Sequence, residues 1–203
     1  MAQRRSNPML DVALIAVFAA LIVVFSITPA IPVPGIPVPI TLQTLAIALT
    51  AMIIGPWRGA AATLLYLAIG FAGLPVFAGG ASHIQVLTRP SAGYLISFPI
   101  YAVIVGLLAR TFLRAKKTLR PLLLVAAGLI GSFLVVHPLG ILGMARNIPV
   151  PLGTALKYDL AFWIGDVIKT VLAAAIATAV HSAFPALLAR REPTIAEPSA
   201  QAS

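Results

Sequence analysis

Asp166 and Lys169 are an acid and a base that stand three residues apart inside an apolar segment, WIGDVIKTVLA over 163–173. In a helix this spacing puts both side chains on one face. Each charge near the centre of a membrane helix costs roughly 2.5–3.5 kcal/mol, so both should face the bundle interior and find partners. The pair could hold a polar ligand, or it could only neutralise itself and keep the helix in place.

Other polar side chains lie close to the ends of apolar segments. The guanidinium of Arg89 could clamp a carboxylate in bidentate geometry, or it could anchor lipid headgroups. Gln43 could pair with a ligand or with neighbouring backbone, whereas Thr41 and Thr44 are expected to pack. Asp159, two helical turns before Asp166, is expected to be solvated near the membrane interface.

Several enzyme and metal classes are excluded by the motifs that the sequence lacks. It has no cysteine, no nucleophile-elbow motif and no phosphate-binding loop, so the chain itself is predicted not to hydrolyse ATP. His83, His137 and His181 are scattered without metal-ligand spacing. No metal or cofactor is therefore expected.

The elements that must position these residues are apolar helices. With 60% hydrophobic and 9% charged residues, the composition excludes an ordinary soluble domain. No segment alternates as a barrel strand does, so we expect an all-α integral membrane bundle of six transmembrane helices over residues 9–190. The expected segments are Met9–Ile27, Ile40–Ile54, Trp57–Phe71, Ser91–Phe112, Leu122–Gly143 and Leu156–Leu188.

The basic residues orient this bundle. An N-in/C-in arrangement places ten of them inside and three outside, in agreement with the positive-inside rule. The inner set is Arg4, Arg5, Arg58, Arg110, Arg114, Lys116, Lys117, Arg120, Arg190 and Arg191, and the outer set is Arg89, Arg146 and Lys157. Residues 1–8 are then a cytoplasmic N-terminus, and 191–203, rich in Pro, Ala and Ser, a disordered cytoplasmic tail.

Two long loops fall on the outer side in this arrangement. Residues 28–39 are rich in proline and uncharged, which predicts a stiff lid. Residues 72–90 exceed an ordinary linker in length and are a functional-loop candidate, although a plain loop resting on the bundle is the alternative. On the first helix, Ala16 and Ala20 form a small-xxx-small stripe that permits close approach of a partner helix.

Four segments, in order, resemble the BioY family, the biotin-binding substrate component of energy-coupling factor (ECF) transporters: Pro39–Ala46, Leu65–Gly80, Ala92–Pro99 and Gly165–Lys169. The resemblance extends from the first helix to about Leu188. It implies an outward-facing biotin pocket closed by the first and third loops. This chain departs from the usual family pattern over Leu87–Leu95, where backbone geometry is expected to differ.

The resemblance also implies roles for individual residues. Asp166 and Lys169 would bind the ureido end of biotin, since a ureido group offers two N–H donors to a carboxylate and one carbonyl to an ammonium. Arg89 would face the valerate carboxylate. Further contacts are expected from Gln43, Tyr94, Gly79 and Gly80.

Partners follow from the same resemblance. The chain is expected in the cell membrane, in contact with lipid, where Ala16 and Ala20 would dock onto a transmembrane coupling subunit that rides on two ATPases. Two other functions stay open. A secondary transporter of another small organic anion would need a coupling-ion site or an internal repeat, and neither is found. An intramembrane enzyme would need a second catalytic group beside Asp166, yet two of the five acidic residues lie in the tail.

Overall fold

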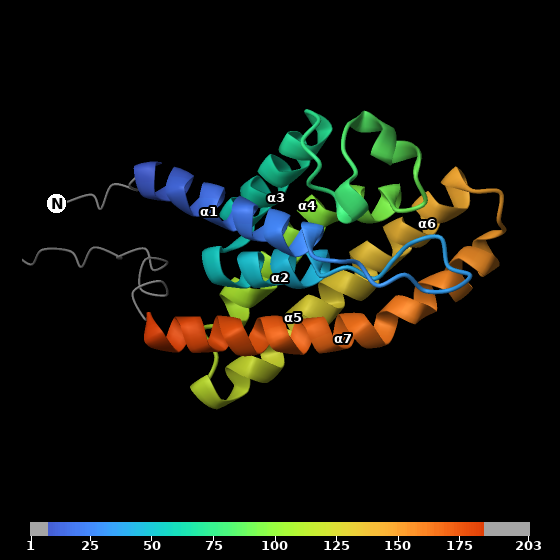
Figure 1. Cartoon of the computed structure of the whole chain (residues 1–203). Helices are drawn as coiled ribbons and strands as arrows, with labels where there is room; N and C mark the ends of the chain where they lie inside the picture. Colours follow the sequence, from blue (N-terminus) through green and yellow to red (C-terminus); the bar gives the residue numbers. More distant parts are fainter. Residues whose placement is uncertain (1–7, 185–203) are drawn as a thin grey trace, which may run out of the picture.

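The computed structural model describes residues 8–184, and Figure 1 shows it as a bundle of helices. The predicted cytoplasmic N-terminus, apart from residue 8, and the predicted tail 191–203 lie outside the described residues, as do Arg4, Arg5, Arg190 and Arg191. Within residues 8–184 every regular element is helical, and only two isolated β-bridges occur. The predicted all-α class is confirmed.

The longer helices match the predicted apolar segments closely. They are α1 (Pro8–Ile27), α2 (Gln43–Ile54), α3 (Pro56–Phe71), α4 (Ala92–Phe112), α5 (Arg120–Gly131), α6 (His137–Asn147) and α7 (Leu152–Ala183). Helix α7 begins four residues earlier than expected. Among residues 8–184, four stretches are long and apolar enough to cross a membrane: α1, α4, the continuous run Lys117–Asn147, and α7.

Helices α2 and α3 are shorter than the candidate membrane spans α1, α4 and α7 and meet at a sharp break. Gly55 ends α2 with a φ of 88°, and Pro56 occupies the first turn of α3, where its missing N–H costs no hydrogen bond. Every residue of α2 except Thr44 is buried, so this helix lies at the centre of the bundle, between α1 and α7 in Figure 1. Burial inside protein explains why a helix of 12 residues is sufficient here.

One turn of π-helix, η4 (Ser132–Val136), joins α5 to α6. The backbone N–H of His137 bonds to the carbonyl of Ser132, five residues back, in place of the usual four. The predicted fifth segment, Leu122–Gly143, is therefore two α-helices joined through a wider turn. This turn sets the direction in which His137 leaves the backbone.

The two long loops contact the bundle at the same end. Residues 28–42 fold back on themselves through a bridge between Ile31 and Ile40, and Figure 1 shows this segment reaching along α7. Val38 packs there with Met144, Ala155 and Phe162. Residues 72–91 contain two short 3-10 turns, η1 (Ala78–Gly80) and η2 (Ile84–Thr88).

Candidate ligand-binding site

A cavity of about 230 Å³ lies between the two loops, the N-terminal ends of α2 and α4, and the middle of α7. Its wall combines apolar and aromatic side chains with a few polar groups, which is the usual make-up of a small-molecule site. The polar or charged residues that line it are Thr41, Gln43, Thr44, Arg89, Ser91, Tyr94, Asp166 and Lys169. Six of the seven predicted substrate contacts line this cavity: Asp166, Lys169, Arg89, Gln43, Tyr94 and Gly79.

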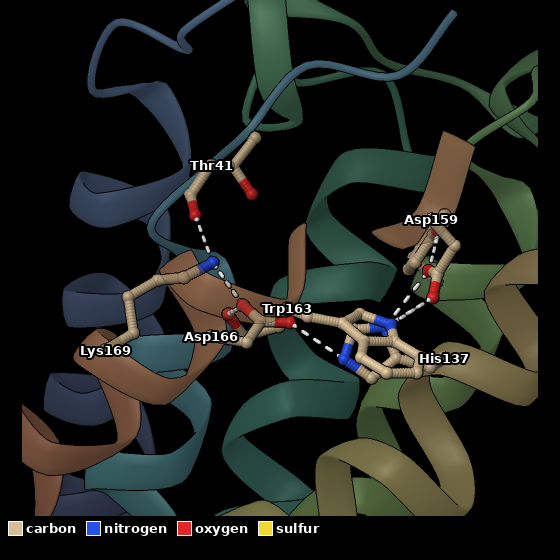
Figure 2. Close-up of polar contacts among 8 residues, drawn as sticks. Thr41, His137, Asp159, Trp163, Asp166 and Lys169 are labelled. Atoms are coloured by element: carbon tan, nitrogen blue, oxygen red, sulfur yellow. Dashed lines mark hydrogen bonds and ion pairs between the residues drawn. The ribbon is translucent and has the colours of Figure 1, made fainter. Parts of the chain in front are cut away.

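Asp166 and Lys169 form an ion pair on α7 and are 4% and 8% exposed. Both line the cavity. Figure 2 shows the two side chains paired with each other, with Lys169 reaching Thr41. The ammonium also donates to the backbone carbonyl of Thr41 at 3.1 Å. Because both charges face the protein interior and an adjoining cavity, the pair has the placement that a ligand-binding role requires.

Thr44 does more than pack, contrary to our expectation. Its hydroxyl donates to Asp166 Oδ1 at 3.1 Å, from the one residue of α2 that is not buried. The reason is that Thr44 lies at the N-terminal end of α2, opposite the charged pair on α7. Thr41 likewise has a polar role, because its carbonyl accepts from Lys169 and its hydroxyl donates to Gln43 at 2.9 Å.

Gln43 joins the cavity to a network across three helices. Its amide lies 2.6 Å from the hydroxyl of Tyr66 on α3, which in turn lies 2.9 Å from Ser26 on α1. All three side chains are buried. The network satisfies their polar groups and holds the amide of Gln43 at the cavity wall.

The expectation that Asp159 is solvated is wrong, because its side chain is fully buried. It accepts hydrogen bonds from the Tyr94 hydroxyl at 2.6 Å and the Trp163 ring N–H at 2.8 Å, and it lies 2.9 Å from His137 Nδ1. The helix continues seven residues beyond Asp159 to Leu152, so Asp159 is not at the helix end. The seven-residue spacing to Asp166 was the available signal, since it puts both carboxylates on one face.

His137 was also missed by the sequence analysis, which tested histidines only for metal-ligand spacing. Its ring lies between the two carboxylates of α7, as Figure 2 shows, with Nε2 3.4 Å from Asp166 Oδ2. The side chain is buried and does not line the cavity. An ionisable residue inside a predicted span was the signal that could have found it.

Tyr94 reaches Asp159 because glycines let α4 and α6 approach closely. A Cβ on Gly143 would lie 2.5 Å from the backbone of Gly93, and a Cβ on Gly140 would collide with the ring of Tyr94. The ring therefore fits over Gly140 and packs edge-on against Phe162, 5.8 Å away. The departure from the family pattern around this segment still leaves Tyr94 at the cavity wall.

Arg89 and the two loop glycines lie at the exposed edge of the site. Arg89 lines the cavity, and its backbone carbonyl accepts from the Asn147 amide at 2.8 Å. Its guanidinium forms no ion pair with the part of the chain that the structure describes. Gly79 lines the cavity but Gly80 does not.

Ala16 and Ala20 lie on α1, and no residue of this helix lines the cavity. Both are exposed on α1, beside the exposed side chains of Val12, Val17 and Val24. In the 18-residue apolar stretch of α1, 17% is buried, the lowest share among the four candidate spans of the described chain. Its outer face is therefore free to contact lipid or another protein.

The comparisons with known proteins agree with this arrangement. The family model described as BioY family matches residues 1–186. The chain belongs to the BioY family. A biotin transporter BioY of Rhodobacter capsulatus is 37% identical, with 89% of this chain and 98% of that protein covered. One of Rhizobium etli is 34% identical, with 89% and 97% covered. The resemblance inferred from the sequence is confirmed.

A solved structure shares the fold. The crystal structure of the S-component for biotin from an ECF-type ABC transporter matches with a TM-score of 0.78 and 26% identity, covering 89% of this chain and 95% of the other. Together with the apolar helices, these relatives show that this BioY-family chain is a multi-pass membrane protein.

Proposed function

We propose that this chain binds biotin for uptake, as the substrate-specificity component of an ECF-type transporter, and is not an enzyme. The observation that carries the proposal is a buried carboxylate–ammonium pair, Asp166 and Lys169, in the wall of a mostly apolar cavity. Biotin has a compact apolar body, a ureido head and a carboxylate tail. Membership of the BioY family supports the same ligand.

The proposed ligand placement follows from donor and acceptor types. Asp166 accepts the two ureido N–H groups, and Lys169 donates to the ureido carbonyl. The bicyclic body rests against Phe77, Phe98 and Phe162 of the cavity wall. The valerate carboxylate extends toward Arg89, with Gln43, Tyr94 and Gly79 as further contacts. Gly80 is left out of the contact set because it does not line the cavity.

Binding tests this assignment directly. Asp166→Asn is expected to weaken biotin affinity at least about a hundredfold, because each hydrogen bond to a charged group contributes roughly 1.5–3 kcal/mol. The measurement is equilibrium binding of labelled biotin to purified protein. Asp11→Asn is the matched control, since Asp11 pairs with Arg58 at 2.6 Å on the partly exposed flank of α1 and α3. Unchanged affinity in Asp166→Asn would remove the site assignment.

We further propose six spanning helices, counting α5 and α6 as one, with both termini in the cytoplasm. The distribution of basic residues supports this orientation. The chain has no cysteine, so single cysteines introduced at Ser82 and Thr118 report without background. A membrane-impermeant maleimide added to intact cells should label Ser82→Cys and spare Thr118→Cys. The opposite pattern would invert the topology.

The partners we propose are the lipid of the cell membrane, a transmembrane coupling subunit and two ATPases. The chain itself needs no cofactor, because ATP is used by the partner subunits. The exposed small residues of α1, Ala16 and Ala20, support docking of the coupling subunit there. Proton flux accompanying uptake by the isolated chain would favour a secondary transporter instead, and a chemically altered ligand would favour an enzyme.

A further inference from the structure

His137 lies between two carboxylates in the bundle interior. Its Nδ1 is 2.9 Å from Asp159 Oδ2 and 3.0 Å from Asp159 Oδ1, and its Nε2 is 3.4 Å from Asp166 Oδ2. His137, Asp159 and Asp166 are 2%, 0% and 4% exposed. The ring therefore joins the residue proposed to bind ligand to a second acid that does not line the cavity.

Both carboxylate oxygens of Asp159 accept hydrogen bonds from neighbouring side chains. The Trp163 ring N–H is only a donor, and it lies 2.8 Å from Oδ2, while the Tyr94 hydroxyl donates to Oδ1 at 2.6 Å. Both oxygens of Asp159 therefore act as acceptors. The neighbouring Nδ1 of His137, which faces the same two oxygens, must then carry a hydrogen and donate as well.

The other ring nitrogen has a different environment. Within the described part of the chain, Nε2 is buried and has no hydrogen-bond partner. The nearest oppositely charged atom is Asp166 Oδ2 at 3.4 Å. In a neutral ring with its hydrogen on Nδ1, Nε2 would point a lone pair at a carboxylate, which is repulsive. In an imidazolium, Nε2 would be a donor facing an acceptor.

A charge count favours the imidazolium. Asp159, Asp166 and Lys169 alone leave one uncompensated negative charge among groups that are all less than a tenth exposed. Unpaired buried charge is strongly destabilising, and a positive His137 makes the cluster neutral. The rings of Phe133 and Trp163, with centroids 4.8 and 5.9 Å away, add cation–π stabilisation. Phe133 faces the ring from η4 and Trp163 from α7, while Tyr94 of α4 donates to Asp159, the acid next to the ring.

The backbone is adapted to this placement. His137 begins α6 directly after the π turn η4, whose wider hydrogen bond shifts the side chains that follow it around the helix axis. Single π turns are rare and occur frequently at functional sites. Here the turn directs a histidine from α6 at two carboxylates of α7.

We propose that His137 is a positively charged positioning residue, which ties Asp166 to Asp159 and holds the carboxylate of Asp166 ready for the ligand. This inference rests on the proposed function for its ligand and extends it to residues outside the cavity wall. Asp166 then has one oxygen held by Lys169 and Thr44 and the other faced by His137. A carboxylate fixed at both oxygens loses little freedom when it accepts a ligand.

A charge-balance experiment tests the proposal. His137→Gln leaves the cluster with a net negative charge, and Asp159→Asn leaves it with a net positive charge. Each single variant is expected to weaken biotin binding at least about tenfold. The double variant is neutral again and should bind within about threefold of the wild type. His83→Gln, on the exposed loop, is the matched histidine control and should bind normally.

Two results would overturn the proposal. One is a double variant whose biotin affinity is no higher than that of the single variant that binds more weakly. The other is wild-type affinity in His137→Gln. A second measurement does not depend on folding of the variants. In protein labelled with ¹⁵N-histidine, the two ring nitrogens of His137 should give the closely spaced shifts of an imidazolium. One widely shifted, unprotonated nitrogen would refute it.

These outcomes are separate from those of the proposed function. If wild-type protein binds no biotin, the proposed function fails, and the nitrogen shifts alone decide the charge of His137. If wild-type protein binds biotin and the variants of His137 and Asp159 do so equally well, the proposed function stands and this inference fails.

Discussion

The ammonium of Lys169 binds the backbone carbonyl of Thr41 at 3.1 Å while it pairs with Asp166. One residue of α7 thereby joins the charged centre of the site to the loop that precedes α2. An ammonium has three donors, so one remains for a ligand carbonyl. In the proposed binding mode, Lys169 would connect ligand recognition to the segment that forms one wall of the cavity.

Stability and binding at the charged pair can be separated by replacing both charges. Lys169→Met should lower the free energy of unfolding by about 3–5 kcal/mol, because it leaves Asp166 without its closest counter-charge. The double variant Asp166→Leu/Lys169→Met should recover part of this loss yet bind no biotin. Thermal unfolding in detergent and equilibrium binding measure the two effects. A double variant less stable than Lys169→Met would contradict the argument.

Arg89 should recognise the carboxylate tail and not the head of the ligand. Arg89→Gln is expected to weaken biotin binding about tenfold or more, since a hydrogen bond to a charged group contributes roughly 1.5–3 kcal/mol. Biotin methyl ester, which lacks the negative charge, should bind the variant and the wild type alike. Competition against labelled biotin compares the two ligands. An equal loss for both would assign Arg89 a structural role.

Gly140→Ala should displace the ring of Tyr94, because the added Cβ would overlap it. Overpacking of this kind costs about 1–3 kcal/mol, and it also breaks the bond from the Tyr94 hydroxyl to Asp159. We expect lower thermal stability and weaker biotin binding. The control is Gly153→Ala in the first turn of α7, where a Cβ meets no atom within 4 Å. Equal stability of the two variants would show that the ring moves freely.

The α1 face can be tested without disturbing the cavity. Ala16→Leu/Ala20→Leu enlarges two exposed side chains and should leave biotin binding to the isolated chain unchanged. If the coupling subunit docks there, the larger side chains prevent close helix approach, and copurification with that subunit should fall. Val12→Leu, on the same helix, controls for added volume. Unimpaired assembly of the double variant would place the docking surface elsewhere.

Much of the fold was predictable because a membrane allows few backbone structures. Apolar runs that must satisfy their own backbone in lipid can only be helices or barrels, so the helical class and most helix positions follow from composition. The π turn before His137 was not predicted. Pro138, inside the predicted span, was the available signal for a break in the helix, because proline has no N–H to donate and its ring crowds the preceding turn.

The site was predicted in part. Asp166 and Lys169 stood out because charges are costly in an apolar helix, and the family resemblance added Arg89, Gln43 and Tyr94. Asp159 was assigned to solvent from its apparent place near a helix end, and the error came from an underestimated helix length. The polar role of Thr44 also escaped notice, because it depends on the register of α2 against α7.

By itself, the sequence determined the membrane-helical class and the acid and base of α7, since these depend on composition and on spacing along one helix. Its ordered motifs resembled one family, and the family match over residues 1–186 confirmed it. Only the tertiary structure decided that His137 stands between Asp159 and Asp166, that the loops before α2 and α4 share one cavity, and that Gly79 but not Gly80 lines it. The physical reason is that contacts between segments depend on helix register and close approach at glycines, which no single segment encodes.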